Sequence, residues 1–406
     1  MKAGATTRSP SRPLSLWLLT AGGFFAFFTF GFVDNIKGPA LPNLLQDLNF
    51  SYSQGGGVLF GAYLGFVIAT LLAGPLSDLL GNRMILLAAG LFIALGTLGL
   101  GSATTYPLLF GSMLIIGMGT GAIEVGGNGL IVVLHPQAQA RFVNLLATFH
   151  GVGAMIAPLY AAWILTGLGN WRQVFLYSVP LAVLLALIFL ATAGPQGGSL
   201  VTQQERHGFD WATLRRTGFS PTMIYFYLAL GLYVATELGI AAWLVEYLIK
   251  RKGIAQTTSA YYLSGFFAFI MVGRLIGSVF VERIGYLRSV LLAAVGTLLC
   301  ILSALFAPSA LAFFLPLSGL FCSIIFPTIT AAVSRLHPQN TGTILGLLFT
   351  AAGVGGALGP TAIGVVSDLL GIQWGFGLTA LFCAGSMVAM GVLLRNEIYD
   401  QTRTKR

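Results

Sequence analysis

Charged residues are scarce in this sequence. Aspartate and glutamate together contribute 12 of the 406 residues, lysine and arginine contribute 21, and all four make up 8% of the chain. Soluble domains carry ~25% charged residues, because a water-facing surface is built largely from them. Hydrophobic residues reach 56%, and the mean hydropathy is +0.86. These values exclude a soluble enzyme and indicate a chain whose exterior faces lipid.

Cysteine and histidine are also rare, with three and four residues. Cys300, Cys322 and Cys383 all fall inside apolar stretches, and their spacing predicts neither a metal site nor a disulfide framework. The sequence contains no nucleophile elbow and no nucleotide-binding motif. We therefore expect no enzyme activity, no metal and no cofactor. The net charge of +9 is spread between apolar stretches, so we expect no nucleic acid partner.

Apolar runs long enough to cross a bilayer fill most of the chain. A helix needs ~20 apolar residues to span the hydrocarbon core. The first run follows Lys2, Arg8 and Arg12 and is too long for a signal peptide, so it predicts a first span. In all, the sequence predicts twelve spans, at residues 14–36, 53–77, 83–101, 107–132, 143–167, 172–194, 221–249, 259–281, 289–306, 308–333, 342–367 and 373–395.

The distribution of lysine and arginine predicts the orientation of these spans. If the N-terminus is cytoplasmic, most of the 21 basic residues fall on the inner side, as the positive-inside rule requires. The exceptions on the outer side are Lys37, Arg172 and the run 250–252. We therefore predict a multi-pass protein of the plasma (inner) membrane with both termini in the cytoplasm.

An internal repeat divides the spans into two sets of six. The segment LHPQ at 134–137 recurs at 336–339, GVG at 151–153 recurs at 353–355, and Pro158 is matched by Pro360. All three pairs are 202 residues apart, so one ungapped register relates the two halves. The longest polar stretch, rich in glycine, glutamine and serine, lies between the sixth and seventh spans and has the composition of a linker.

The turn between the second and third spans carries a recognisable motif. Residues 74–83 read GPLSDLLGNR, which matches the pattern G-x-L-x-D-x-x-G-x-R of the major facilitator superfamily. Together with the repeated halves, this motif makes the whole chain resemble that superfamily. The resemblance implies an all-α polytopic fold with twelve transmembrane helices in two pseudo-symmetric bundles. We expect the bundles at residues 1–194 and 221–406 and a cytoplasmic linker at 195–220.

The same motif predicts a conformational gate on the cytoplasmic side. Gly74 and Gly81 allow close helix approach, and Asp78 could lie against the positive end of span eleven and pair with Arg83. A degenerate copy between spans eight and nine contains Arg274 and Glu282. The alternative is that Asp78 and Arg83 only cap and orient a tight turn.

Polar residues inside the spans are concentrated in the first half. In the 202-residue register, Glu124, Asn128, Asn144 and His150 correspond to Phe326, Thr330, Gly346 and Ala352. A carboxylate at mid-bilayer costs several kcal/mol unless it pairs, protonates or faces water. Because Glu124 and Asn128 are four residues apart on one predicted helix, they share a helix face. A purely structural role remains the alternative for Glu124, and a packed, hydrogen-bonded ring for His150.

Two further carboxylates lie in spans one and seven. Asp34, followed by Asn35, is near the outer end of span one, and Glu237 is near the middle of span seven. In the superfamily, spans one, four and seven line the central cavity, so the resemblance places Asp34, Glu124 and Glu237 around one space. These carboxylates could take up H⁺ or bind Na⁺. Asp34 could instead be an ordinary loop-edge residue, and Glu237 a structural one. We expect Glu246, near the outer end of span seven, in a solvated gate.

Aromatic residues and local motifs narrow the resemblance. Trp243 lies less than two turns after Glu237, where a sugar ring could stack on it. The segments GAIEVGGNG at 121–129 and ELGIAAWLV at 237–245 are similar to the fucose/glucose–cation symporter branch. That branch implies that Asp34 and Glu124 bind substrate and couple protons. One departure is Ala147, where the branch often has histidine.

These observations predict a secondary active transporter that works by alternating access. The favoured hypothesis is symport of a sugar or similar small polar solute with H⁺ or Na⁺, in a monomer embedded in the lipid bilayer. One alternative is a proton-coupled exporter of amphipathic compounds. The other, from a different class, is a receptor or sensor on a transporter scaffold.

Overall fold

Twelve helices long and apolar enough to cross a membrane account for most of the structure, a computed structural model that describes residues 13–192, 218–337 and 341–404. No strand occurs in these ranges. The count of twelve predicted spans is therefore confirmed for the described part of the chain. The first half comprises α1 (Pro13–Asn35), α2 (Lys37–Asp47), α3 (Tyr52–Leu80), α4 (Asn82–Ser102), α5 (Tyr106–Leu134), α6 (Gln139–Leu168), α7 (Trp171–Leu176) and α8 (Val179–Thr192).

The second half repeats this order with small interruptions. Its tenth span is divided into α13 and α14, as the sixth span is divided into α7 and α8. The elements are α10 (Pro221–Lys252), α11 (Gln256–Ile284), α12 (Tyr286–Phe306), the short 3₁₀ helix η2 (Ser309–Leu311), α13 (Phe314–Cys322), α14 (Ile325–Leu336), α15 (Thr341–Leu370) and α16 (Ile372–Thr404).

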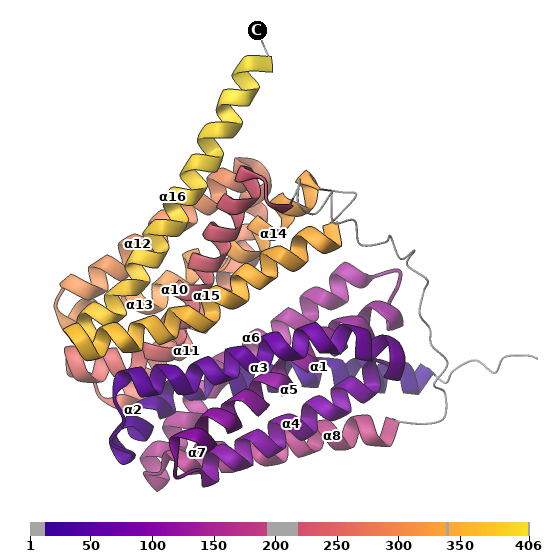
Figure 1. Cartoon of the computed structure of the whole chain (residues 1–406), viewed down its shortest axis with the longest axis vertical. Coiled ribbons are helices and arrows are strands. Elements are labelled where there is room, and N and C mark those ends of the chain that lie inside the picture. The colour runs from indigo at the N-terminus through magenta and orange to yellow at the C-terminus, as the bar shows by residue number, and fades with distance from the viewer. Residues whose placement is uncertain (1–12, 193–217, 338–340, 405–406) are drawn as a thin grey trace, which may run out of the picture.

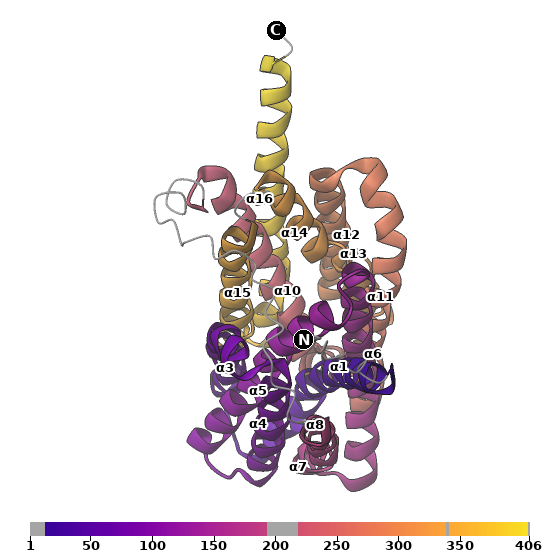
Figure 2. The same ribbon diagram turned by 90° about the vertical axis from the view of Figure 1, so that its right-hand side faces the viewer.

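The helices form two bundles, α1–α8 and α10–α16, which lie one above the other in Figure 1. The bundles meet at the end of the molecule that holds α2, here called the α2 end. They diverge toward the end where α8 stops and α10 begins, here called the linker end. Figure 2 shows the same two groups from the side. The predicted linker, 195–220, lies almost entirely outside the described residues, so the domain boundaries stay a prediction.

Repeated glycines explain why the two halves pack alike. A Cβ on Gly153 of α6 would lie 2.2 Å from the carbonyl oxygen of Phe28 on α1. A Cβ on the equivalent Gly355 of α15 would lie 1.9 Å from the carbonyl oxygen of Gly231 on α10. Only glycine allows backbones to approach so closely. The repeated segment GVG therefore packs the fifth span on the first and the eleventh on the seventh.

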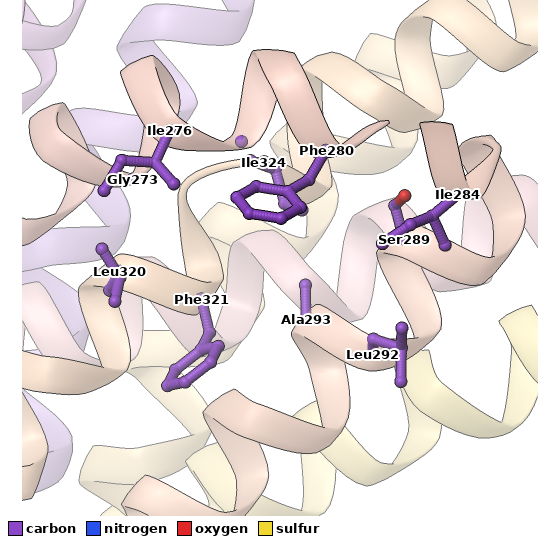
Figure 3. Close-up of a pocket in the computed structure, with 11 residues that line it drawn as sticks. Gly273, Ile276, Phe280, Ile284, Ser289, Leu292, Ala293, Leu320, Phe321 and Ile324 are labelled. Carbon is purple, nitrogen blue, oxygen red and sulfur yellow. The ribbon is translucent and has the colours of Figure 1, made fainter. Parts of the chain in front are cut away.

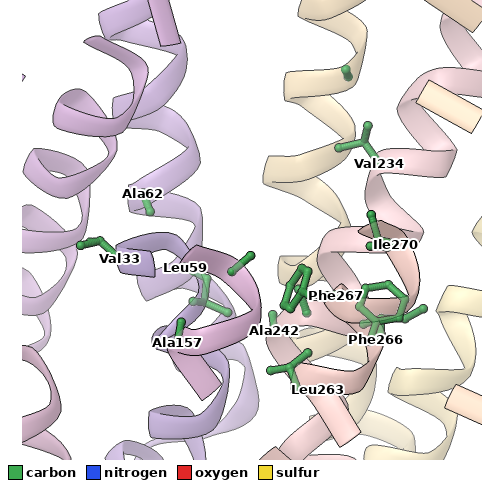
Figure 4. Close-up of a cluster of buried hydrophobic side chains, with 14 of the residues drawn as sticks. Val33, Leu59, Ala62, Ala157, Val234, Ala242, Leu263, Phe266, Phe267 and Ile270 are labelled. Carbon is green, nitrogen blue, oxygen red and sulfur yellow. The ribbon is translucent and has the colours of Figure 1, made fainter. Parts of the chain in front are cut away.

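Backbone contact and buried apolar side chains close the α2 end. A Cβ on Gly38 of α2 would lie 2.3 Å from the carbonyl oxygen of Ala241 on α10. Leu59 and Ala157 of the first bundle and Leu263 of the second belong to the buried cluster that Figure 4 shows. The expectation that span one ends at residue 36 is wrong, because helix resumes at Lys37 and the span continues to Asp47.

The outer surface of both bundles is rich in exposed leucine, isoleucine and phenylalanine, as expected of helices that face hydrocarbon. A groove between α11, α12 and α13 opens on this surface and is lined by apolar side chains such as Ile276, Phe280 and Phe321 (Figure 3). Ser289 contributes a hydroxyl group to the lining of the groove, and no charged side chain is among the lining residues. This apolar lining is typical of a depression that faces lipid and not of a site that binds a polar solute.

Candidate functional site

Asp34 forms an ion pair at the break in span one. The break falls at Ile36, between α1 and α2, and places Asp34 and Lys37 on either side of it. The Nζ atom of Lys37 lies 2.5 Å from Oδ1 of Asp34, and the two side chains are 5% and 19% exposed. Asn35 is buried and donates to the carbonyl oxygen of Gly31 within the helix. Its amide group is therefore bonded to the backbone of α1 just before the break.

Tyr63 of α3 lies between this ion pair and a carboxylate of the second bundle in electrostatic terms. The Lys37 ammonium lies 5.3 Å from the centre of its ring. Its hydroxyl interacts electrostatically with both Asp34 and Glu237, the first in one bundle and the second in the other. Sequence reasoning missed Tyr63, because a single tyrosine in an apolar span carries no signal until its neighbours in space are known.

Glu237 of α10 lies among polar groups from both its own helix and α11. Its carboxylate interacts with the hydroxyl of Tyr233, one helical turn earlier, and electrostatically with Arg274. Arg274 is exposed and was predicted as a gate residue from the degenerate motif. Its charge lies within electrostatic range of Glu237, and its role in a gate stays a prediction.

His150 of α6 completes this group. Its ring meets the Phe30 ring edge to face, with centroids 4.6 Å apart and an interplanar angle of 74°. It interacts electrostatically with Asp34 and Arg274. We call the resulting set the inter-bundle polar cluster; its members are Asp34, Lys37, Tyr63, His150, Glu237 and Arg274.

Glu124 and Asn128 form a separate pair on α5. Nδ2 of Asn128 donates to Oε1 of Glu124 over 3.1 Å and to its carbonyl oxygen over 2.8 Å. The shared helix face predicted from their spacing is thus observed. Neither of the two ion pairs in the described ranges includes Glu124. Asp34 and Glu237 share Tyr63 as an electrostatic neighbour and Glu124 does not, so only two of the three carboxylates are related in this way.

Two predicted residues lie away from both groups. Asn144 is exposed on α6, toward the linker end, and its carbonyl oxygen accepts from Thr148. Trp243 is completely buried, and its indole Nε1 donates to the carbonyl oxygen of Pro360 over 2.8 Å. Its ring meets that of Tyr52 edge to face. The hydrogen bond lies within the second bundle, and the ring contact with Tyr52 crosses to the first bundle at the closed α2 end, so the expected sugar-stacking position is not observed in this conformation.

A hydrogen-bonded latch joins the bundles around Tyr52, the first residue of α3. Its backbone N–H and that of Ser53 donate to the two carboxylate oxygens of Asp368, each over 2.8 Å. Its hydroxyl donates to Oε1 of Glu246 over 3.1 Å. Glu246 is only 2% exposed, so the expectation of a solvated position for it is wrong. The latch consists of Tyr52, Ser53, Trp243, Glu246, Pro360 and Asp368.

The contacts predicted for a gate at the linker end are not made in this structure. A Cβ on Gly74 would meet nothing within 4 Å, and Asp78 and Glu282 are exposed. Arg83 donates to the carbonyl oxygen of Thr192 rather than to Asp78, so the predicted Asp78–Arg83 pair is not formed here. Gly81 has φ +84° and ends α3, which explains the glycine at that motif position.

The sequence profile of the Major Facilitator Superfamily matches residues 23–317 and 253–406. This chain belongs to the major facilitator superfamily. It is a membrane transporter with two six-span bundles, and it is not an enzyme. The superfamily resemblance of the motif at residues 74–83 is thereby confirmed.

Named relatives match almost the whole chain at low identity. A glucose/galactose transporter of Brucella abortus is 24% identical over 391 residues, which cover 90% of this chain and 92% of the relative. The L-fucose-proton symporter of Escherichia coli is 25% identical over 383 residues, covering 85% and 86%. The similarity to the fucose/glucose branch expected from residues 121–129 and 237–245 is confirmed by these matches.

Solved structures show the same fold. A bacterial homolog of the human lysosomal transporter Spinster, in an inward-facing and unoccupied conformation, has a TM-score of 0.78 at 17% identity. The match covers 95% of this chain and 98% of that one. The transporter FucP in the outward conformation has a TM-score of 0.62 at 24% identity, covering 93% and 99%.

Proposed function

We propose that this chain is a sugar–proton symporter that works by alternating access. In this proposal, Glu124 carries the coupling proton, and the inter-bundle polar cluster binds the hydroxyl groups of the sugar. The protein acts as a monomer in the plasma (inner) membrane, with the linker end in the cytoplasm. No cofactor takes part beyond the coupling ion.

The observation that carries the proposal is the setting of Glu124. It lies in the interior of a membrane-spanning helix, and its one hydrogen-bonding side chain, in the described ranges, is the neutral amide of Asn128. An intramembrane carboxylate without a cation is costly in its charged form, so it favours proton uptake. One carboxylate and one amide suffice to hold a proton. They would supply few of the oxygen ligands that a bound metal cation needs, which favours H⁺ over Na⁺.

The substrate class is supported by the chemistry of the polar cluster and by the relatives. Tyrosine, histidine, carboxylate and guanidinium groups from both bundles offer donors and acceptors that match sugar hydroxyls. Because these groups come from both bundles, a bound solute would contact both halves of the protein. Relatives named as glucose/galactose and fucose transporters match most of the chain, which supports the same class.

The conformation supports alternating access. The latch and the contact at Gly38 close the α2 end, whereas the predicted contacts of Asp78 at the linker end are not made. Since the basic residues predict a cytoplasmic linker end, the structure corresponds to an inward-open state. The higher TM-score to the inward-facing solved structure agrees with this assignment.

The proposal is tested with purified protein in proteoliposomes, using labelled hexoses under imposed proton or sodium gradients. The wild type should accumulate a hexose when protons flow in with it. Glu124→Gln should keep sugar exchange but lose accumulation against a gradient, because the amide cannot carry a proton. Glu397→Gln, in α16 beyond the last span, is the matched control and should accumulate normally.

Other outcomes would identify other functions. Accumulation by Glu124→Gln at the wild-type level would remove Glu124 from coupling. Accumulation driven only by a sodium gradient would replace the proton as coupling ion. Expulsion of amphipathic dyes without hexose uptake would favour the exporter, and hexose binding without uptake under any gradient would favour a receptor.

A further inference from the structure

The ion pair between Asp34 and Lys37 is buried inside a membrane span. Lys37 is the more enclosed partner, at 5% exposure, and its other close contact is the ring of Tyr63. Lysine is rarely found so deep unless a counter-charge is present, because its ammonium group loses its hydration. The distribution of basic residues predicted Lys37 in an outer loop, so this position is not explained by membrane orientation.

Both partners belong to the same segment of chain. Asp34 and Lys37 are three residues apart, on either side of the break at Ile36. Contacts between the bundles, such as that of Gly38 with Ala241, have to separate when the α2 end opens. A pair within one span does not have to separate. The ammonium can therefore remain beside Asp34 in both conformations.

We propose that Lys37 is a tethered counter-ion that occupies Asp34 in place of a coupling cation. The span-one carboxylate is then neutralised by the chain itself and carries no proton during transport. Coupling is left to Glu124, so one proton accompanies each sugar. Lys37 acts through Asp34 as a positioning residue, and it determines the ratio of cation to substrate. This inference rests on the proposed symport.

Other titratable groups lie near the pair, and their contribution to any measured pH dependence must be distinguished from that of Asp34. Tyr63 of α3 and His150 of α6 lie within electrostatic range of Asp34. In the second bundle, Glu237 lies within such range of Tyr63, and Arg274 of His150. All of them are retained in variants at positions 34 and 37. A comparison between such variants therefore cancels the contributions of these groups, except that of His150, which feels the charge of Asp34 directly.

The first measurement is the pH dependence of thermal unfolding of the purified protein, which requires no transport. Lys37→Met leaves Asp34 unpaired and should lower the Tm by several degrees at pH 7.5. Acidification to pH 5 should recover much of this loss, because protonated Asp34 needs no counter-ion. The double variant Lys37→Met/Asp34→Asn removes both charges and should follow the pH profile of the wild type. Lys37→Arg keeps the charge and should do the same.

The second measurement is the number of charges moved per sugar in proteoliposomes. The wild type should move one charge per sugar. Lys37→Met should move two, because Asp34 now takes up a second proton from the medium. An equal Tm loss at all pH values together with an unchanged charge ratio would show that Lys37 only stabilises the kink, and would overturn the proposal.

The two readouts separate this inference from the proposed function. If the wild type transports no sugar but Lys37→Met shows the acid-dependent recovery, the symport proposal fails while the pairing of Asp34 by Lys37 stands. If the wild type already moves two protons per sugar, symport stands and the tethered counter-ion is refuted.

Discussion

Tyr63 lies within electrostatic range of carboxylates in both bundles. It interacts with Asp34 of α1 and Glu237 of α10, and its ring also lies near the Lys37 ammonium. A phenol in this position can donate to one sugar hydroxyl and accept from another. The residue therefore offers a direct test of whether the cluster contacts substrate.

Tyr63→Phe keeps the ring and its contact with Lys37 but removes the hydroxyl. If this hydroxyl binds the sugar, its loss should weaken binding by about threefold to tenfold, the usual effect of one net hydrogen bond. The affinity is measured from the stabilisation of purified protein by hexose. Tyr261→Phe, at an exposed position of α11, is the matched control. Unchanged affinity in Tyr63→Phe would place the sugar elsewhere.

The sequence predicts some of these residues and not others, for physical reasons. Asp34, Glu124 and Glu237 stand out because a carboxylate inside an apolar span needs an explanation. Lys37 does not, because the following Gly-Pro resembles a loop, although proline is tolerated in the first turn of α2. Hydropathy also cannot tell which side of a fully buried helix faces the substrate, so the burial of Trp243 in this conformation was not predictable.

At the scale of elements, α3 and α15 end in the same five residues. Ser-Asp-Leu-Leu-Gly occurs at 77–81 and again at 367–371, and both glycines have positive φ, +84° and +88°. The two helices pack against each other and run in opposite directions, because Asp368 at the end of α15 binds the start of α3. By the same geometry, Asp78 at the end of α3 lies toward the start of α15.

The two aspartates should therefore act on opposite states. Asp368 accepts two backbone N–H groups at a helix N-terminus, an arrangement stabilised by the helix dipole. Asp368→Asn should weaken closure of the α2 end and shift the population toward outward-open by about tenfold, for about 1.4 kcal/mol. Asp78→Asn should shift it the other way, toward the conformation described here.

Spin labels placed at both ends of the molecule would measure these populations from distances between the bundles. Each variant should also slow cycling without changing which sugar is selected. A shift in the same direction for both variants would contradict the reciprocal arrangement. A changed substrate range would show that the aspartates contact the sugar rather than the helix ends.

At the scale of the whole molecule, alternating access requires the α2 end to open once in every transport cycle. Gln256 of α11 donates to Oδ1 of Asn43 and to the carbonyl oxygen of Pro39, so residues 43 and 256 lie in contact across the bundles. The three native cysteines are buried in the second half and should react little with added reagents.

A double variant, Asn43→Cys/Gln256→Cys, should be cross-linked by a short bifunctional thiol reagent. Transport should then stop, because the α2 end can no longer open, and a reductant that cleaves the reagent should restore it. Each single cysteine variant treated in the same way should retain transport. Full activity in the cross-linked protein would show that the bundles need not separate at these residues.

The architecture was predictable from sequence, whereas the conformation was not. Hydropathy gave the twelve spans, and the 202-residue register explains why Gly153 and Gly355 pack equivalent helices. The same sequence must stabilise both an inward-open and an outward-open state, with a small free-energy difference between them. Local patterns therefore predict the polar groups at both ends but not which end is closed.

The contacts that close the α2 end are hydrogen bonds and apolar packing. Of the ion pairs in the described ranges, one joins Asp34 to Lys37 and the other Asp47 to Arg172, so both lie within the first bundle. Dissolved electrolyte screens exposed charge pairs strongly but affects buried neutral contacts little. The exposed carboxylate of Asp368, held at the start of α3 by two backbone N–H groups and the helix dipole, is such a charged contact, so a briny medium should weaken closure of the α2 end and a dilute one should favour it.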